Sequence, residues 1–278
     1  AGRPLPVDDL RAGLDCLQAV LAEELPSDVG SPAVQLLEEA RAGFDALESD
    51  VSAGLAGSSP TDRLTARYIL AALEGERREA TELVLNAVRA GELSVQDALL
   101  HVVLRAQREL GRMWHANELS IVEEHVVSGV TGRLVGLLAA LGHAAPFHGK
   151  TVLLAALEDD EHDIGLRALS ELFDLDGWRC VVPGGRLPPA ELAFAVERYD
   201  VDVLLLSATL DGHRLKVVEA LRALRAGPGR GARLPVFVGG PAFGRGAAEP
   251  ALRDLDAQAV GARDAVGSAR VAAGLDQA

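Results

Sequence analysis

The spacing of apolar residues in this chain changes once, near residues 146–150. Before that point, apolar residues recur with the period of about 3.6 that is typical of amphipathic helices. After it, short apolar runs alternate with helical stretches, and Thr151–Leu157 is the first of these runs. Such runs are typical of strands buried on both faces of a parallel sheet. The chain is therefore predicted to fold into a helical part followed by an α/β part.

The helical part is predicted to contain an antiparallel four-helix bundle over residues 61–145, because short connections join its helical stretches. Its last helix opens with the capping-box pattern Ser120-x-x-Glu123. An N-terminal helical extension, residues 1–60, precedes the bundle. It has two helical patterns at roughly 7–24 and 32–53, a breaker at 26–32 and a linker at 54–60. The bundle helices are expected near 62–73, 75–90, 94–113 and 120–141.

The α/β part, residues 146–278, is predicted to be a flavodoxin-like, doubly wound, five-stranded parallel sheet of order 2-1-3-4-5. In such sheets ligands bind at the carboxyl ends of the strands. Strands are expected at 151–157, 178–182, 201–207, 235–238 and 257–260, and helices near 163–175, 189–199, 212–225, 243–254 and 264–275.

Charge restricts the partners of the chain. The formal net charge is −14, and residues 1–60 carry eleven Asp or Glu against three Arg. Such a segment repels phosphates, so we expect no DNA binding. No apolar run reaches the roughly 18 residues of a membrane span, and no signal-peptide pattern opens the sequence, so we expect a cytoplasmic protein without a membrane partner. The two cysteines fit buried thiols in a reduced compartment.

Polar and glycine residues follow three of the predicted strands. Asp160-x-His162-x-x-Gly165 follows the first, and a His near a carboxylate can bind a metal through its other ring nitrogen. Taken alone, this loop also fits a solvated polar turn. Hydroxyls follow the third strand and paired glycines the fourth, and each also fits ordinary strand-end chemistry. These residues are Ser207, Thr209, Gly239 and Gly240.

This ordered set resembles the cobalamin-binding domain of methionine synthase, methylmalonyl-CoA mutase and related proteins, over residues of about 150–275. The resemblance implies that His162 is the lower cobalt ligand and that Asp160 orients it. It also implies that Ser207 and Thr209 line the pocket for the cofactor's dimethylbenzimidazole tail, and that Gly165, Gly239 and Gly240 leave room for the cofactor.

The bundle carries a second pattern, Trp114-x9-Glu124-His125. A core Trp, a solvated carboxylate and a structural His are the alternatives for these residues. Over about residues 61–142 the pattern resembles the helical cap of light-sensing cobalamin-dependent repressors of the CarH or LitR type. The resemblance implies that Trp114 and Glu124 pack against an adenosyl group, with His125 beside them. His115 then matches the position that can take the upper cobalt site after photolysis.

The N-terminal extension departs from those repressors, which have a basic winged-helix domain in its place. The chain in this respect resembles stand-alone cobalamin photoreceptors, including photocobilins, which hold a bilin as a second chromophore. Residues 1–60 have one aromatic residue, Phe44, and no His, so the sequence itself does not show a bilin site. The extension could form such a pocket, a partner-binding surface or a dimer interface.

Together these patterns predict an adenosylcobalamin photoreceptor, a binding and signalling module rather than an enzyme. We expect it to be a homo-oligomer that acts on an unknown protein partner, with biliverdin or another bilin as an optional second cofactor. The alternative is a corrinoid carrier for methyl transfer, which shares both domains. A detached mutase subunit fits least, because the chain has no substrate barrel.

Overall fold

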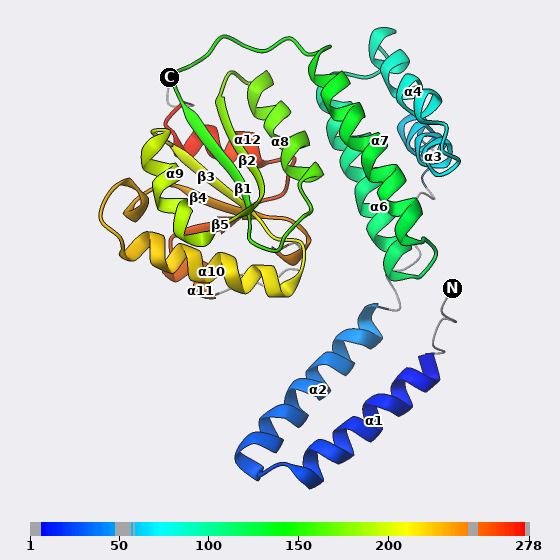
Figure 1. Ribbon diagram of the computed structural model, residues 1–278, viewed down its shortest axis with the longest axis vertical. Helices are drawn as coiled ribbons and strands as arrows, with labels where there is room; N and C mark the ends of the chain where they lie inside the picture. The colour runs from blue at the N-terminus through cyan, green and yellow to red at the C-terminus, as the bar shows by residue number, and fades with distance from the viewer. Residues whose placement is uncertain (1–6, 48–56, 58, 244–249, 276–278) are drawn as a thin grey trace.

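The computed structural model describes residues 7–47, 57, 59–243 and 250–275. Helices come first along the chain and a parallel sheet follows, as predicted (Figure 1). The predicted bundle helices are present as α3 (Pro60–Leu73), α4 (Arg77–Arg89), the run α5 (Val95–Asp97), η1 (Ala98–Val103) and α6 (Leu104–His115), and α7 (Ile121–Ala139).

The third bundle helix differs from its prediction in two ways. Its segment η1 is a π-helix, and the helix continues through His115 rather than ending at residue 113. It ends there because Asn117 adopts a left-handed conformation (φ 56°), and the Glu118 N–H then donates to the Met113 carbonyl. Trp114 and His115 therefore project from a helix, and the connecting loop begins after them.

The sheet has the predicted order, β2-β1-β3-β4-β5, with all neighbouring strands parallel. β1 is buried along its whole length, because helices cover both faces. The strands are β1 (Thr151–Leu157), β2 (Arg179–Leu187), β3 (Val203–Ser207), β4 (Val236–Gly239) and β5 (Ala257–Ala259).

Strand β2 is longer than the predicted 178–182. Its continuation, beyond the predicted end at residue 182, contains Pro183 and Gly184. β2 is an edge strand, where a proline does not remove a needed ladder hydrogen bond. The register against β1 shifts along this stretch, and Gly184 takes a positive φ of 86°.

Two layers of helices cover the sheet. Helices α8 and α12 pack with one face of β1 and with the bundle, whereas α9 and α10 pack on the other face. Of the helix predicted at 243–254, residues 244–249 lie outside the described residues. The helical segments of this part are α8 (Ile164–Leu175), η2 (Pro189–Glu191), α9 (Leu192–Arg198), α10 (Asp211–Ala226), η3 (Arg230–Ala232), η4 (Pro241–Phe243), α11 (Pro250–Asp254) and α12 (Ala265–Ala272).

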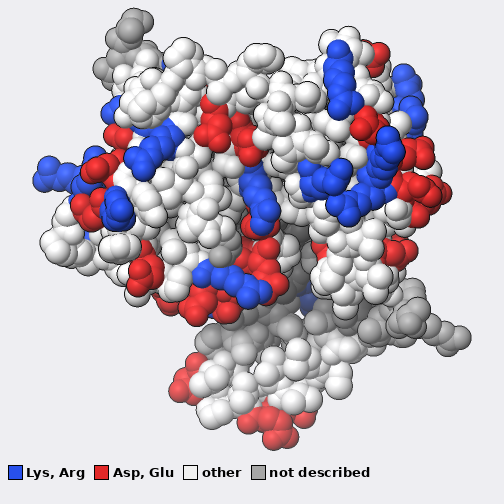
Figure 2. Space-filling model, turned by 45° about the horizontal axis from the view of Figure 1, so that its top comes forward, with Lys and Arg blue, Asp and Glu red and all other residues white. Residues whose placement is uncertain are grey.

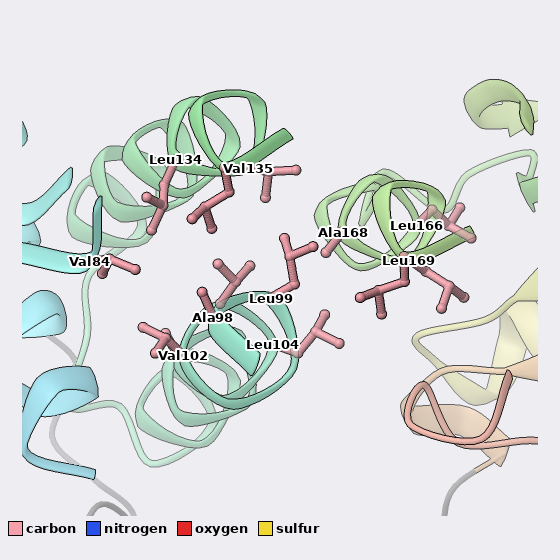
Figure 3. Packing of buried hydrophobic residues seen from close by; sticks show 14 of the residues in the cluster. Val84, Ala98, Leu99, Val102, Leu104, Leu134, Val135, Leu166, Ala168 and Leu169 are labelled. Atoms are coloured by element: carbon pink, nitrogen blue, oxygen red, sulfur yellow. The ribbon is translucent and has the colours of Figure 1, made fainter. Parts of the chain in front are cut away.

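The bundle and the sheet share one continuous core. Leu99 of η1 and Leu104 of α6 lie beside α8, where Ala168 and Leu169 meet them (Figure 3). All four side chains are buried. This contact holds the loop end of the bundle beside the carboxyl edge of the sheet, where the sequence places its chemistry.

The N-terminal extension is a helical hairpin of α1 (Val7–Glu24) and α2 (Ser27–Leu47) (Figure 1). The prediction of a breaker over 26–32 is wrong, because α2 begins at Ser27 and contains Pro32. A Cβ at Gly30 would lie 3.0 Å from the Leu21 carbonyl oxygen, so the two helices approach each other closely at this turn. Residues 48–53 of the second predicted helix, and 54–56 and 58 of the predicted linker, lie outside the described residues.

Two local features complete the fold. Ser59 caps α3 through a box with Asp62, so this end of the predicted linker belongs to the bundle. None of the helices within the described ranges is long and apolar enough to cross a membrane.

Candidate functional site

Asp160 and His162 form the centre of the site, in the loop between β1 and α8. The His162 Nδ1 lies 2.8 Å from Asp160 Oδ1, and the His162 backbone N–H donates to the same oxygen at 3.2 Å. In the neutral imidazole with the proton on Nδ1, which the carboxylate favours, the lone pair is on Nε2. The His162 side chain is 61% exposed, so Nε2 is accessible to a ligand. This is the arrangement of a metal-binding imidazole whose tautomer is fixed by an acid.

Asp160 is buried and firmly held. The Thr209 backbone N–H, from the loop after β3, donates to Asp160 Oδ2 at 2.9 Å. Burial acts to raise the pKa of Asp160, but hydrogen bonds from the His162 ring, the His162 backbone and Thr209 outweigh it, so the pKa lies below its ordinary value. The carboxylate thus stays charged and joins the ends of β1 and β3.

The environment of His162 favours the charged imidazole. Its pKa is raised, chiefly by the hydrogen bond to Asp160, against the opposing effect of burial, and further by the negative charges of Asp160, Glu124 and Glu161. Glu124 belongs to α7 of the bundle. The bundle pattern and the sheet pattern therefore lie close enough to interact electrostatically, although 38 residues separate them in sequence.

Gly165 lies in the first turn of α8 and is exposed. A Cβ built at this position meets no atom within 4 Å. Nothing in the protein itself requires a glycine here, so the open space beside His162 fits the approach of a bulky ligand.

Gly240 has a different reason to be glycine. Its φ is +93°, and a Cβ would lie 2.4 Å from the Ala208 carbonyl oxygen and 2.9 Å from Ser207 Oγ. The close approach of the loops after β3 and β4 is enough to require a glycine at this position, whether or not a ligand binds. At Gly239 a Cβ would lie 3.2 Å from the Val260 carbonyl. The predicted residues Ser207, Thr209, Gly239 and Gly240 do meet at the carboxyl edge of the sheet, but the glycines have a packing role there as well.

In the bundle, Trp114 is 49% exposed near the end of α6, so it is not a core residue. Its ring makes an edge contact with His115, at 5.4 Å between centroids. His115 is exposed. An indole held half out of a helix offers an apolar surface to a ligand.

Glu124 takes no part in the helix cap, which its neighbour Glu123 makes. Ser120 and Glu123 make the predicted capping box, each bonding the other's backbone N–H. Glu124 accepts a hydrogen bond from Ser128 Oγ and contacts His125 Nδ1, both at 2.5 Å. The His125 side chain is largely exposed, and its Nδ1 atom pairs with this carboxylate.

Sequence reasoning missed His213, in the first turn of α10. Its Nδ1 lies 3.2 Å from Asp160 Oδ2, although the two atoms lack hydrogen-bond geometry. The position of His213 in the sequence could have indicated it. His213 lies six residues after the end of β3, and Thr209 lies two residues after the same strand end. Two ion pairs also flank the loop after β1, Lys216 with Asp159 and Arg186 with Glu161.

A well-defined cavity lies elsewhere in the bundle. It is a groove of about 710 Å³ between α3 and α4, and Leu64, Leu83 and Asn86 are among its lining residues. Neither the loop of His162 nor Trp114 contributes to it. The site is therefore identified from its residues rather than from cavity size.

Over the face shown in Figure 2, basic and acidic side chains are intermixed, and no large area of one charge is visible on that face.

Comparisons with known proteins identify both domains. A family model described as a B12 binding domain matches residues 150–264, and a second model with the same description matches residues 64–139. The HTH-type transcriptional repressor CarH of Myxococcus xanthus is 34% identical over 139 residues. That match covers 48% of this chain and 44% of the repressor, so it spans less than half the length of that relative.

One solved structure shares the architecture. The monomethylamine corrinoid protein of Methanosarcina barkeri superposes with a TM-score of 0.63 at 17% identity, over 73% of this chain and 95% of the other. At this identity the likeness concerns the fold. The two family matches cover the bundle and the sheet separately, and the chain is thus a cobalamin-binding protein with both domains.

Proposed function

We propose that this chain, with cobalamin-binding domains at residues 64–139 and 150–264, is a light-sensing receptor for adenosylcobalamin. The observation that carries the proposal is that the buried Asp160 holds an exposed His162 in the sheet, while the bundle presents a half-exposed Trp114. The negative charge of Glu124, on the bundle, contributes to the raised pKa of His162, which supports placing both patterns around one ligand. The similarity to CarH over 139 residues supports the choice of a receptor.

Within this proposal, His162 would hold the cobalt through Nε2, and Asp160 fixes the tautomer and orientation of the ring. Ser207, Thr209, Gly239 and Gly240 hold the cofactor's tail at the carboxyl edge, and Gly165 admits the ring. Trp114 and Glu124 contact the adenosyl group, with His125 supporting Glu124. His115, exposed beside Trp114, is the residue of the bundle that would be available to bind the cobalt in the photolysed form.

When bound, adenosylcobalamin supplies a cobalt–carbon bond that visible light breaks, and this photochemistry belongs to the cofactor. The protein contributes the positions of its own groups. Trp114 and Glu124 would pack against the adenosyl group, and without that contact the packing of bundle against sheet would change. We propose that this change is the signal.

Trp114→Ala is expected to weaken binding of adenosylcobalamin about 10-fold and to leave hydroxocobalamin binding nearly unchanged. The half-exposed indole buries apolar area only against the adenosyl form, and its removal leaves no hole in the bundle core. Titrations of both cofactors followed by absorbance measure the two affinities. Equal losses for both would assign Trp114 a structural role and contradict the proposed contact.

The output is tested by size-exclusion chromatography of the adenosylcobalamin-loaded chain, in the dark and after complete photolysis. We expect a change in oligomeric state or compactness. Gel-shift assays are expected to show no DNA binding in either state, since the acidic extension repels phosphates. Identical elution in the two states would refute the proposed signal, and retained DNA would refute the expected absence of DNA binding.

A corrinoid carrier remains the second candidate, because the corrinoid protein of Methanosarcina barkeri has the same architecture. A preference for methylcobalamin together with no response to light would favour it. A bilin as second chromophore is an optional part of the proposal to which no residue is assigned, and titration with biliverdin tests it.

A further inference from the structure

The hairpin of α1 and α2 has little core of its own. Each helix makes its extensive contacts with the other, and neither packs broadly on the rest of the described chain. Among the hairpin residues whose burial is described, 11–39 and 41, Gly30 is the buried one, and every described side chain is partly or fully exposed. Two helices that bury so little against each other gain stability from a third element.

The two flanks of the hairpin differ. On one flank, Arg41 pairs with Asp15 of α1 and donates to Gln18, and Gln18 donates to Glu38. This network joins α1 to α2 and covers that side with polar groups. That flank therefore offers little apolar area for a partner to bury.

The opposite flank is apolar. By helical spacing, Leu17 and Val20 lie on the side of α1 away from Asp15, and Val29 and Leu36 lie on the side of α2 away from Glu38. All four are exposed, by 46%, 48%, 53% and 66% respectively. We call these four residues the apolar flank. Exposed Leu and Val side chains that share one side of a helix pair are typical of a docking surface.

Charge selects the occupant of this flank. Residues 7–47 carry nine Asp or Glu and two Arg, and one of these, Arg41, is engaged by Asp15. A second copy of the hairpin would bring the same negative charge and be repelled. A helix with an apolar stripe bordered by Lys or Arg would match both the apolar flank and its charge.

We propose that the apolar flank of the α1–α2 hairpin docks a basic amphipathic helix of a partner protein. The partner helix lays its apolar stripe on Leu17, Val20, Val29 and Leu36, and its cations meet the surrounding carboxylates. This inference does not depend on the cofactor, because the hairpin contains none of the cobalamin residues.

The test uses the full chain and two synthetic 20-residue helical peptides. Both have Leu at positions i, i+3, i+4 and i+7, and one has Lys and the other Glu at the remaining positions. Fluorescence anisotropy of labelled peptide measures binding at low and high salt. We expect the Lys peptide to bind, its affinity to fall as salt rises, and the Glu peptide not to bind.

Matched variants identify the surface. Leu17→Gln combined with Leu36→Gln is expected to weaken binding of the Lys peptide at least about 10-fold, whereas Phe194→Gln, an equally exposed apolar residue on α9, leaves it unchanged. Circular dichroism checks that the helices persist. If the double variant loses helix, Glu23→Gln with Glu24→Gln decides, since it should weaken binding and flatten its salt dependence.

Three results would overturn the proposal. The first is equal binding of the Lys peptide by the wild-type chain and the double variant, which would reflect attraction to negative charge anywhere on the chain. The second is binding of the Glu peptide as tight as that of the Lys peptide. The third is a dimer of the wild-type chain in sedimentation equilibrium that strengthens with salt and is lost in the double variant, which would assign the flank to a second copy.

Discussion

Cobalamin bound to a His162→Ala variant is expected to lose the absorption spectrum of the imidazole-ligated form. The His162 Nε2 is the exposed ring nitrogen of an imidazole whose other nitrogen is tied to Asp160 at 2.8 Å. The nearest other imidazole in the sheet, that of His213, is mostly buried and faces the other oxygen of Asp160. It is therefore not placed to substitute for His162. Cobalamin affinity should fall by about 100-fold or more, as expected when a metal ligand is lost outright.

Asp160→Asn is the graded control for this experiment. It keeps the shape of the residue but weakens the hold on His162, so affinity should fall by about 10- to 100-fold while the imidazole-ligated spectrum remains. Absorption spectra and titrations of both variants give these results. An unchanged spectrum in His162→Ala would exclude His162 as the lower ligand.

Two glycines near the site are expected to respond to alanine in opposite ways. Gly240→Ala should lower the free energy of unfolding by about 2–4 kcal/mol, because a left-handed φ is costly for alanine and its Cβ would overlap the Ala208 carbonyl. Gly165→Ala meets no atom within 4 Å and lies in a helix, so stability should stay the same or rise by up to about 1 kcal/mol.

Cofactor binding separates their roles further. Gly165→Ala should weaken cobalamin binding by about 10-fold, because its methyl group occupies space that the ligand approaches. Urea denaturation of the apo chain and cobalamin titration provide the two measurements. A Gly165→Ala variant with unchanged affinity would place the cofactor away from the start of α8, and a Gly240→Ala variant of wild-type stability would contradict the close approach of the loops after β3 and β4.

Much of the fold could be predicted from the spacing of apolar residues. The run Thr151–Leu157 is β1 to the residue, because a strand buried on both faces leaves an uninterrupted apolar stretch. Where prediction failed, local signals were overridden by tertiary context. Pro32 reads as a breaker but lies inside α2, and Pro183 reads as a strand end but lies in edge strand β2. The π-helical turn at Ala98–Val103 has no sequence signature of its own.

Some contacts of the candidate site could likewise be predicted from the sequence, and others could not. The pairing of Asp160 with His162 follows from their spacing, and the capping box of Ser120 and Glu123 follows from theirs. The hydrogen bond from the Thr209 backbone N–H to Asp160 could not be predicted, because every residue except proline has a backbone N–H and the residue type therefore gives no signal. The approach of Glu124 to His162 depends on the packing of η1 and α7 against α8, which a single sequence does not specify.

The central claim is that the chain holds adenosylcobalamin with His162 below the cobalt and Trp114 and Glu124 facing the adenosyl group. Absorption spectra of the purified chain reconstituted with adenosylcobalamin, recorded in the dark and after green light, test it most directly. The account predicts an imidazole-ligated adenosylcobalamin spectrum in the dark that converts irreversibly on illumination, with the dark signature absent in His162→Ala. A dark spectrum identical in the wild-type chain and the His162→Ala variant, or no change under green light, would contradict it.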